Sequence, residues 1–303
     1  MAGWRIVDFS DFQGSLRYQR GQLLVCPEEG AQVHLPLADL ALVLVGLKVS
    51  MSAAVLHQLA EFDVAVLICG WNGVPVASSL PWNRHTRVGA RQLAQAKVSA
   101  PSRKNAWGRI IKAKIAGQHA NLRLLRRPEW SVLKEMSAAV RSGDPDNLEA
   151  QAARHYWPRL FDAEPGFSRN PGGGAGRNAL LDYGYTVLRG HAIRAVMSAG
   201  LSGALGLFHR GRSNPFNLAD DLIEPFRPVV DLVVATLPEN ASLEHPSVKQ
   251  ALVGASSRPF TSEGYSAATE LMNLAQRLGR YFEGEVSKLK VPVWEPSLDG
   301  LDG

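Results

Sequence analysis

The spacing of apolar residues changes near residue 80, and this change predicts β-structure before that point and helices after it. The first part carries short apolar runs broken by glycine, such as SLRYQRGQLLVC and VAVLIC, which are typical of strands joined by tight turns. In the second part apolar residues recur every three or four positions, as in Ile110, Ile111, Ile115 and Leu122, which is typical of amphipathic helices. We therefore expect an α+β protein in which the helices come last.

Two prolines mark the border between these parts. Pro81 ends the β-rich region and Pro101 restarts the chain as helix, with Ser102 as the expected N-cap. The closing sequence VPVWEPSLDGLDG is acidic and contains Pro and Gly, so we expect a flexible tail whose Trp294 docks on a partner. The predicted parts are a β-rich domain over 1–80, a linker over 81–101, a helical domain over 102–290 and a tail over 291–303.

Positive charge is concentrated between Trp82 and Lys134, where thirteen Lys or Arg residues stand against one acid, Glu129. The whole chain has a net charge of only +5, so the rest of it is acidic. Such a segment predicts a surface that binds nucleic-acid phosphates; the alternative is a solvated helix face. The candidate DNA contacts are Arg84, Arg87 and Arg91 near the linker and Arg109 and Lys112 on the next helix, where Lys114 is also expected at the edge or outside.

Other patterns exclude some functional classes. No apolar run is long enough to span a membrane, and the start MAGWRIVDFS lacks the pattern of a signal peptide. Cys26 and Cys69 match no zinc-site spacing, so we expect buried free thiols in a reducing cytoplasm. The glycine-rich stretch EPGFSRNPGGGAGRN lacks the Gly-Lys-Ser/Thr of a P-loop and is expected to be a mobile loop. We therefore expect a cytoplasmic protein without a P-loop.

A histidine and several acids stand close together in HRGRSNPFNLADDLIEPFRPVVD. His209 opens this stretch, and Asp221 and Glu224 are three residues apart, so on a helix they share a face. Asp220, four residues before Glu224, shares that face as well. A histidine with clustered carboxylates suits a hard divalent cation. The alternative is a core histidine beside an acidic helix N-terminus, with Arg227 in a structural salt bridge.

A further acid, Glu149, lies at a predicted helix start in SGDPDNLEAQAARHYWPRLF. Asp144 is the expected N-cap and Pro145 the first helical residue. The alanines beside Glu149 would let a metal or a phosphate approach the backbone, and Tyr156 is expected on the same face. The alternative is a surface glutamate with good helix propensity.

These stretches together resemble the CRISPR-associated adaptation integrase, the larger of the two proteins that insert new spacers, and a type II system is the expected setting. GLFH followed by a polar loop and DLIEPFRPVVD resembles the family signature. VDFS and VLICGWNGVPV resemble its small β-domain, and KNAWGRIIKAKI, LEAQAARHYW and NALLDYGYTVLRGHAIRAVMSAG resemble its helices. The resemblance covers nearly the whole chain, with one departure at Asp182, where the family pattern has asparagine.

The resemblance implies which residues act. Glu149, His209 and Glu224 become the catalytic ligands of Mg²⁺ or Mn²⁺, and Asp221 a neighbour that binds the same or a second ion. Asn178 and Tyr183 lie in the segment that matches the family's central helix, where they support the site. The N-terminal part becomes a β-sandwich-like domain that builds a homodimer and docks the partner. Two such dimers, bridged by a dimer of the small second adaptation protein, would form a heterohexamer on double-stranded DNA.

The implied reaction is insertion of short DNA fragments into a repeat array by attack of a DNA 3′-OH on a phosphodiester. Two alternatives stay open. A plain metal-dependent nuclease would use the same ligands with water as the nucleophile. A non-catalytic DNA-binding scaffold would use the acids only in salt bridges.

Overall fold

The computed structural model describes residues 5–71, 75–79, 86–164 and 166–297. It divides the chain into two compact units, Met1–Arg87 and Val88–Gly303. The first unit contains the strands, one α-helix and a short 3₁₀ turn, and the second unit contains helices. This arrangement confirms the expected α+β fold. The division falls inside the segment predicted as a linker, but residues 88–97 of that segment form helix α2 of the second unit.

The first unit is built from two four-stranded sheets. In one sheet, β5 (Leu40–Val45) lies parallel to β1 (Arg5–Phe9) and to β7 (Ala65–Cys69), and β8 (Pro75–Ser79) runs antiparallel at the edge beside β7. In the other sheet, β3 (Gln22–Pro27) pairs antiparallel with β2 (Gly14–Gln19) and β4 (Val33–Pro36), while β6 (Val49–Met51) lies parallel to β2. A short 3₁₀ turn, η1 (Leu37–Asp39), leads into β5, and helix α1 (Ala53–Glu61) joins β6 to β7.

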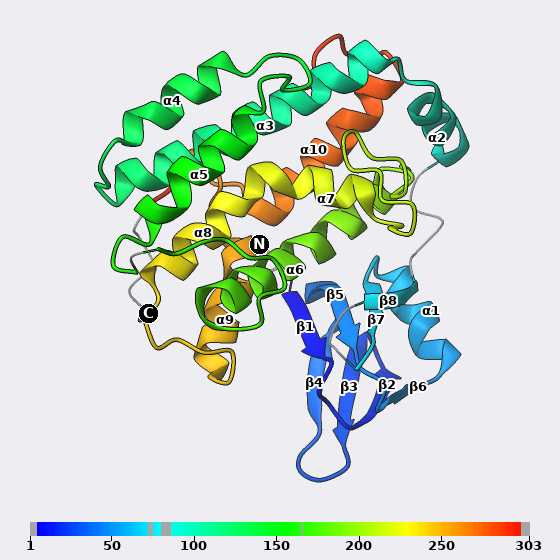
Figure 1. Ribbon diagram of the computed structural model, residues 1–303. Helices are drawn as coiled ribbons and strands as arrows, with labels where there is room; N and C mark the ends of the chain where they lie inside the picture. The colour runs from blue at the N-terminus through cyan, green and yellow to red at the C-terminus, as the bar shows by residue number, and fades with distance from the viewer. Residues whose placement is uncertain (1–4, 72–74, 80–85, 165, 298–303) are drawn as a thin grey trace. The chain divides into compact units, whose positions relative to one another are not determined.

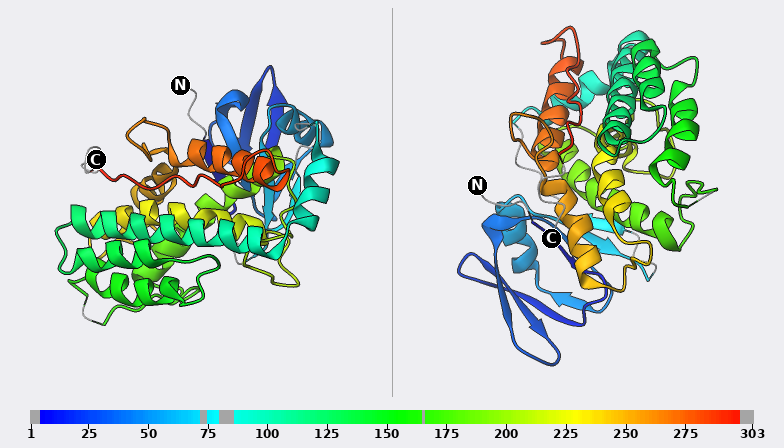
Figure 2. Two further views of the ribbon diagram at one scale, coloured as in Figure 1. Left: turned by 90° about the horizontal axis from the view of Figure 1, so that it is seen from above. Right: turned by 90° about the vertical axis from the view of Figure 1, so that its left-hand side faces the viewer.

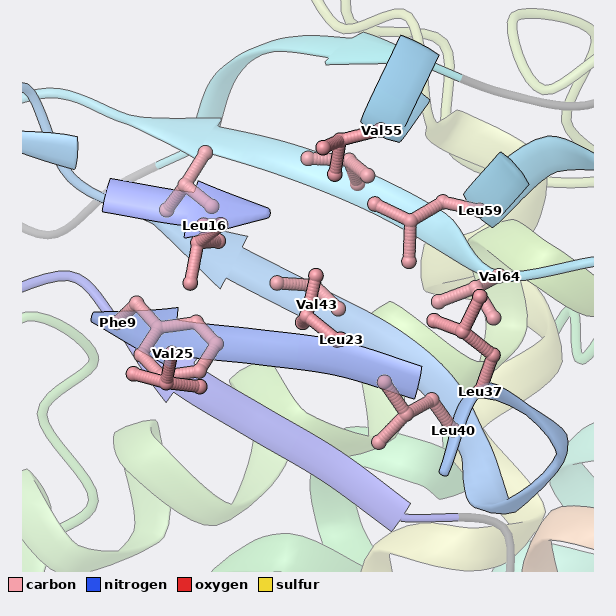
Figure 3. Packing of buried hydrophobic residues seen from close by; sticks show 12 residues of the cluster. Phe9, Leu16, Leu23, Val25, Leu37, Leu40, Val43, Val55, Leu59 and Val64 are labelled. Atoms are coloured by element: carbon pink, nitrogen blue, oxygen red, sulfur yellow. The ribbon is translucent and has the colours of Figure 1, made fainter. Parts of the chain in front are cut away.

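Side chains from both sheets and from α1 form one core, which explains the sandwich-like character (Figure 3). Strand β5 is buried along its whole length, so both of its faces are covered, and this accounts for its continuous rather than alternating apolar sequence. Cys69 is buried and Cys26 is partly buried, and both are free thiols. The core residues labelled in Figure 3 are Phe9, Leu16, Leu23, Val25, Leu37, Leu40, Val43, Val55, Leu59 and Val64.

The second unit is a set of packed helices. Helices α3, α4 and α5 lie side by side, and α6 packs against α7, α8 and α10 (Figures 1 and 2). No helix in the described part of the chain is long and apolar enough to cross a membrane. The elements are α2 (Val88–Lys97), α3 (Ala100–Leu124), α4 (Trp130–Ala139), α5 (Leu148–Leu160), α6 (Gly176–Ser198), α7 (Asn217–Ile223), η2 (Glu224–Phe226), α8 (Arg227–Thr236), α9 (Pro246–Gly254), η3 (Ala255–Ser257) and α10 (Ala267–Phe282).

The start of α3 differs from the expected one. Ser99, and not Ser102, is the N-cap: its Oγ accepts a hydrogen bond from the backbone N–H of Ser102 at 3.2 Å. Pro101 is thereby placed in the first turn, where its missing N–H costs no hydrogen bond. The expectation of Ser102 as cap was wrong by one turn.

The start of α5 also lies three residues later than predicted. The helix begins at Leu148, so Pro145 stands outside it. Asp144 nevertheless acts as a cap, because its carboxylate accepts the backbone N–H groups of Leu148 at 2.9 Å and Glu149 at 3.0 Å. These N–H groups have no partner inside the helix, so Asp144 fixes the turn that carries Glu149.

Arg91 anchors α2 to the rest of the helical unit. Its side chain is 6% exposed, and its guanidinium donates to Glu283 at 3.1 Å, to the carbonyl of Ala199 at 2.7 Å and to Gln276 at 2.8 Å. Gly279 makes room for it, since a Cβ there would lie 2.7 Å from the Arg91 Nη1 atom. Arg91 is therefore a structural residue, and the expectation that it contacts DNA does not hold.

The segment after α10 is held against the helices. Trp294 is 2% exposed and donates from Nε1 to Asn121 Oδ1 at 2.8 Å, and its ring lies 5.4 Å from that of Phe260. The backbone of Glu295 donates to the Phe260 carbonyl at 3.0 Å. Trp294 thus docks on its own chain and not on a partner, and the predicted flexible tail is not borne out over 291–297; residues 298–303 lie outside the described part.

Replacing Trp294 by alanine should destabilise the helical unit. The change removes a buried aromatic ring and leaves the Asn121 acceptor without its donor, so we expect a loss of about 3–5 kcal/mol in the free energy of unfolding. Urea unfolding followed by far-UV circular dichroism measures it. Val293→Ala, at a position that is 40% exposed, should change the free energy by less than about 1 kcal/mol. Equal effects of the two variants would contradict the docked position of Trp294.

Candidate active site

The centre of the candidate site is the ammonium group of Lys114, which lies between two predicted metal ligands. Lys114 Nζ is 2.6 Å from Glu149 Oε1 and 2.6 Å from Glu224 Oε2. The three residues come from the middle of α3, the first turn of α5 and the start of η2. The Lys114 side chain is only 12% exposed, so the expectation that it lies at the outer edge of its helix was wrong.

A second cation, Arg227, holds the other oxygen of Glu224. Arg227 Nε donates to Glu224 Oε1 at 2.8 Å, which confirms the expected salt bridge. Burial alone would raise the pKa of the Glu224 carboxyl, but Arg227 and Lys114 outweigh burial and lower the pKa to about 2. Burial would lower the pKa of Lys114, yet Glu224 and Glu149 raise it. Both groups therefore stay charged at neutral pH.

Glu224 contacts a cation through each of its oxygens. Its Oε2 atom lies 2.6 Å from Lys114 Nζ, and its Oε1 atom accepts from Arg227 Nε at 2.8 Å. Contacts between charged groups this close are among the strong ones in proteins. Glu224 Oε2 therefore faces Glu149 Oε1 across the single positive charge of Lys114.

Asp221 is committed to the loop that carries His209. Its Oδ2 accepts the backbone N–H groups of Leu207 at 2.5 Å and Phe208 at 3.1 Å, and its Oδ1 accepts that of His209 at 3.2 Å and pairs with His209 Nδ1 at 2.7 Å. Gly206 permits this approach, since a Cβ there would lie 2.8 Å from Asp221 Oδ2. The Asp221 side chain is fully buried, so it positions His209 and has no oxygen free for an ion.

The expected convergence of Asp221 and Glu224 is therefore corrected. Helix α7 ends at Ile223, and Glu224 still has right-handed helical backbone angles of φ −54° and ψ −45°, so the two carboxylates differ in the partners that they bind. Asp221 faces the His209 loop, whereas Glu224 faces α3. The hydrogen bond to Asp221 is also the main reason that the pKa of His209 is raised above its ordinary value of 6.5.

Asp220, the third acid of this cluster, belongs to an ion pair. Its oxygens accept Arg189 Nε at 2.6 Å and Nη2 at 3.2 Å, and Asn214 at 2.6 Å. Within the described residues, no group of three or more His, Cys, Asp or Glu side chains is arranged to hold a metal ion. Glu149 and Glu224 come together, and His209 does not join them, so the predicted set of three ligands stays a prediction.

A cavity of about 640 Å³ opens beside this ion cluster. One wall is the glycine-rich loop, which is anchored on α6: Arg169 donates to Asn178 at 3.0 Å, and the backbone of Gly172 donates to Asp182 at 2.8 Å. Asp182, the departure from the family pattern, is thus a loop anchor, and the mobility expected of this loop stays a prediction. The charged residues that line the cavity are Lys114, Arg169, Asp182, Arg189, Asp220, Glu224, Arg227 and Asp231.

A buried tyrosine and aspartate network supports the floor of the site. Tyr185 donates to Asp231, and Arg227 lies over the Tyr185 ring at 4.3 Å. Burial raises the pKa of Asp231 to about 7. Tyr156, expected to line the site, is fully buried and accepts a hydrogen bond from Asn121 at 2.9 Å. Tyr156 therefore belongs to the core that supports Lys114 and Glu224.

A second cavity, of about 420 Å³, lies next to the His209 loop and is lined by three arginines, Arg103, Arg210 and Arg212. No acidic side chain lines it, and in the part of the chain that the structure describes none of the three forms an ion pair. The sequence prediction omitted Arg210 and Arg212, although the two arginines after His209 in HRGRS were a visible signal.

The residues that are predicted to contact DNA differ in their exposure to solvent. Lys112 is exposed, and Arg109 is partly exposed and donates to Asn105 at 2.9 Å. Both lie on α3, the helix that carries Lys114. Arg87 is exposed at the end of the first unit, and Arg84 lies outside the described residues. Their contact with DNA stays a prediction.

Removing the Asp221 charge should lower the pKa of His209. In Asp221→Asn the imidazolium loses the hydrogen bond that raises its pKa, so the titration midpoint should move to lower pH. A pKa raised by folding gives stability that is present at low pH and lost as pH rises through the folded value, so the variant should lose more stability at pH 5 than at pH 8. NMR titration of the His209 ring protons measures the midpoint. An unchanged midpoint would contradict the pairing.

Comparison with known proteins places the chain in a family. Residues 10–252 match the family described as CRISPR associated protein Cas1. The chain is 37% identical over 250 residues to the CRISPR-associated endonuclease Cas1 of Neisseria meningitidis serogroup C (strain 8013), with 79% of each chain covered. It is 28% identical over 292 residues to a CRISPR-associated endonuclease Cas1 of Pyrobaculum aerophilum, with 89% of this chain and 97% of that chain covered.

Solved structures share the fold. A casposase bound to integration product superposes with a TM-score of 0.79 at 20% identity, over 99% of this chain and 96% of that chain. A Cas1 protein from Thermotoga maritima gives a TM-score of 0.74 at 17% identity, over 96% of this chain and 99% of that chain. The sequence match over most of the chain and the shared fold lead to one conclusion: this chain belongs to the Cas1 family of CRISPR-associated proteins.

Proposed function

We propose that this protein is a metal-dependent DNA integrase and endonuclease of CRISPR adaptation, which inserts short DNA fragments into a repeat array. The observation that carries the proposal is the pair Glu149 and Glu224, held around one positive charge beside a cavity lined by arginine and acidic side chains. Curated relatives are named CRISPR-associated endonucleases, and one structural neighbour is titled as a casposase bound to integration product. These names agree with strand transfer and hydrolysis of phosphodiesters.

The proposed metal ligands are Glu149, His209 and Glu224. The two glutamates suit a hard cation, since their oxygens already meet one cationic group at 2.6 Å each. His209 Nδ1 is held by Asp221, which leaves Nε2 as the nitrogen to complete the set. A bound Mg²⁺ or Mn²⁺ would lower the pKa of a DNA 3′-OH and stabilise charge on the attacked phosphate.

The surrounding residues have positioning roles in this proposal. Asp221 fixes the orientation of the His209 ring through its contacts with the ring and with three backbone N–H groups. Arg227 fixes Glu224 by binding one oxygen and leaving the other directed at Lys114. Such support holds ligands in one geometry before the substrate arrives.

DNA would be held mainly by its phosphates. The unpaired arginines Arg103, Arg210 and Arg212, together with Arg109 and Lys112, are proposed to contact the backbone. These contacts carry no sequence information by themselves, so specificity would come from DNA shape and from the assembly. A homodimer and the small second adaptation protein are the proposed partners, and one structural neighbour is titled as a complex that includes Cas2.

Strand transfer tests the proposed reaction. Purified protein, with and without its small partner, is given a labelled duplex with free 3′-OH ends and a supercoiled plasmid that bears a repeat. We expect labelled plasmid with Mg²⁺ or Mn²⁺, none with EDTA or a blocked 3′ end, and a loss of at least about 100-fold in Glu224→Ala, since an anchored ligand is removed.

The other outcomes decide between the alternatives. Nicked plasmid without label would favour a plain metal-dependent nuclease. DNA binding with neither product, in the presence of partner and repeat, would contradict a catalytic role and leave a DNA-binding scaffold.

Removing the arginines beside His209 should weaken DNA binding without abolishing metal binding. In the double variant Arg210→Ala with Arg212→Ala, two phosphate contacts are lost, so the slope of log Kd against log salt should fall by about 2. Fluorescence anisotropy with a labelled duplex measures it. The matched control is Lys288→Ala with Lys290→Ala, at two exposed positions outside the basic segment, and its slope should stay near the wild-type value. Equal salt slopes for the two double variants would contradict phosphate binding by Arg210 and Arg212.

A further inference from the structure

Lys114 occupies the point at which Glu149 and Glu224 meet. Its ammonium lies 2.6 Å from an oxygen of each, and the Lys114 and Glu224 side chains are only 12% and 5% exposed. An ammonium group is a compact point charge, so it fills the same place and supplies the same sign of charge as a small cation. The lysine comes from α3, whereas the glutamates come from α5 and η2.

The two carboxylates need this charge when no metal is bound. Arg227 neutralises Glu224 through Oε1, and Lys114 is the cation that contacts both glutamates. Without Lys114, two carboxylates would face each other in a partly buried site, and like charges at that distance repel.

The contact is nevertheless suited to exchange. The lysine stem is flexible, with four carbons between backbone and charge. Lys114 and Glu224 also line the 640 Å³ cavity, so the ammonium has open space beside the position that it now holds.

We propose that Lys114 is a resident counter-ion of the metal site: it holds Glu149 and Glu224 together in the metal-free protein, and a divalent cation displaces its ammonium from both carboxylates. This rests on the proposed function, because the cation is the one proposed there. The displaced ammonium remains at the cavity wall, where it pairs with a phosphate oxygen of the DNA. Metal and DNA then favour each other's binding, since each takes one partner of the same ion pair.

The direct test is Mn²⁺ binding to the full-length protein without DNA, by isothermal titration calorimetry at constant pH. In Lys114→Met the metal no longer competes with two charged contacts, so the Kd for Mn²⁺ should fall tenfold or more. The melting temperature of the metal-free variant should lie below that of the wild type, and added Mn²⁺ should raise it by more than in the wild type. Lys112→Met, on the same helix but exposed, is the control and should match the wild type in both measurements.

A second measurement uses the wild-type protein and does not depend on the folding of a variant. A short pulse of an amine-reactive acylating reagent, followed by mass spectrometry, reports the accessibility of each lysine. Mn²⁺ should increase labelling of Lys114 severalfold and leave that of Lys112 unchanged.

The outcomes separate this proposal from the proposed function. If Mn²⁺ binds the wild type and Lys114→Met with equal affinity, or more weakly in the variant, or if labelling of Lys114 does not rise, the counter-ion role is wrong while the metal site stands. If Mn²⁺ binds none of the proteins, the metal site itself is wrong, and both proposals fall.

Discussion

The ion cluster of Lys114, Glu149, Glu224 and Arg227 is the interaction on which the rest of the helical unit depends. It joins α3, α5 and the η2–α8 turn through contacts of 2.6 to 2.8 Å. Charges this poorly exposed are stable only when they are paired, and removal of one partner from a buried pair costs roughly 3–5 kcal/mol. The surrounding helices must therefore hold all four side chains in place, and the two carboxylates among them are the proposed metal ligands.

Two other networks hold this cluster in position. Asn121 lies two turns after Lys114 on the same face of α3. It donates to the Pro228 carbonyl at 2.7 Å and accepts from Trp294, so the segment after α10 fixes α3 against α8. Asp144 fixes the first turn of α5 through the N–H groups of Leu148 and Glu149. The site is thus supported by residues outside the ion cluster, and the loop beside it is held in the same way by the buried carboxylate of Asp221.

Much of the architecture followed from local patterns. The change from short apolar runs to a helical repeat predicted strands first and helices second, and Pro81 and Pro101 bracketed the border, which lies between Arg87 and Val88. The cap of α3 was misplaced although a local signal for Ser99 existed, because Pro101 suits the first turn of a helix that Ser99 caps. Arg91 and Trp294 were misjudged because a charged or aromatic residue near a chain border reads as exposed unless its distant partners are known.

The sequence by itself determined the order of the strand-rich and helical units, the concentration of positive charge before residue 135 and the residue types of the candidate site, because these depend on periodicity, composition and motif. The tertiary structure decided what each of those residues faces. Lys114 meets Glu149 and Glu224 across separations of 35 and 110 residues in the chain, and Asp221 binds the His209 loop whereas Glu224 binds Lys114 and Arg227. No local pattern encodes such pairings, since they arise only when distant helices pack and exclude water from the charges between them.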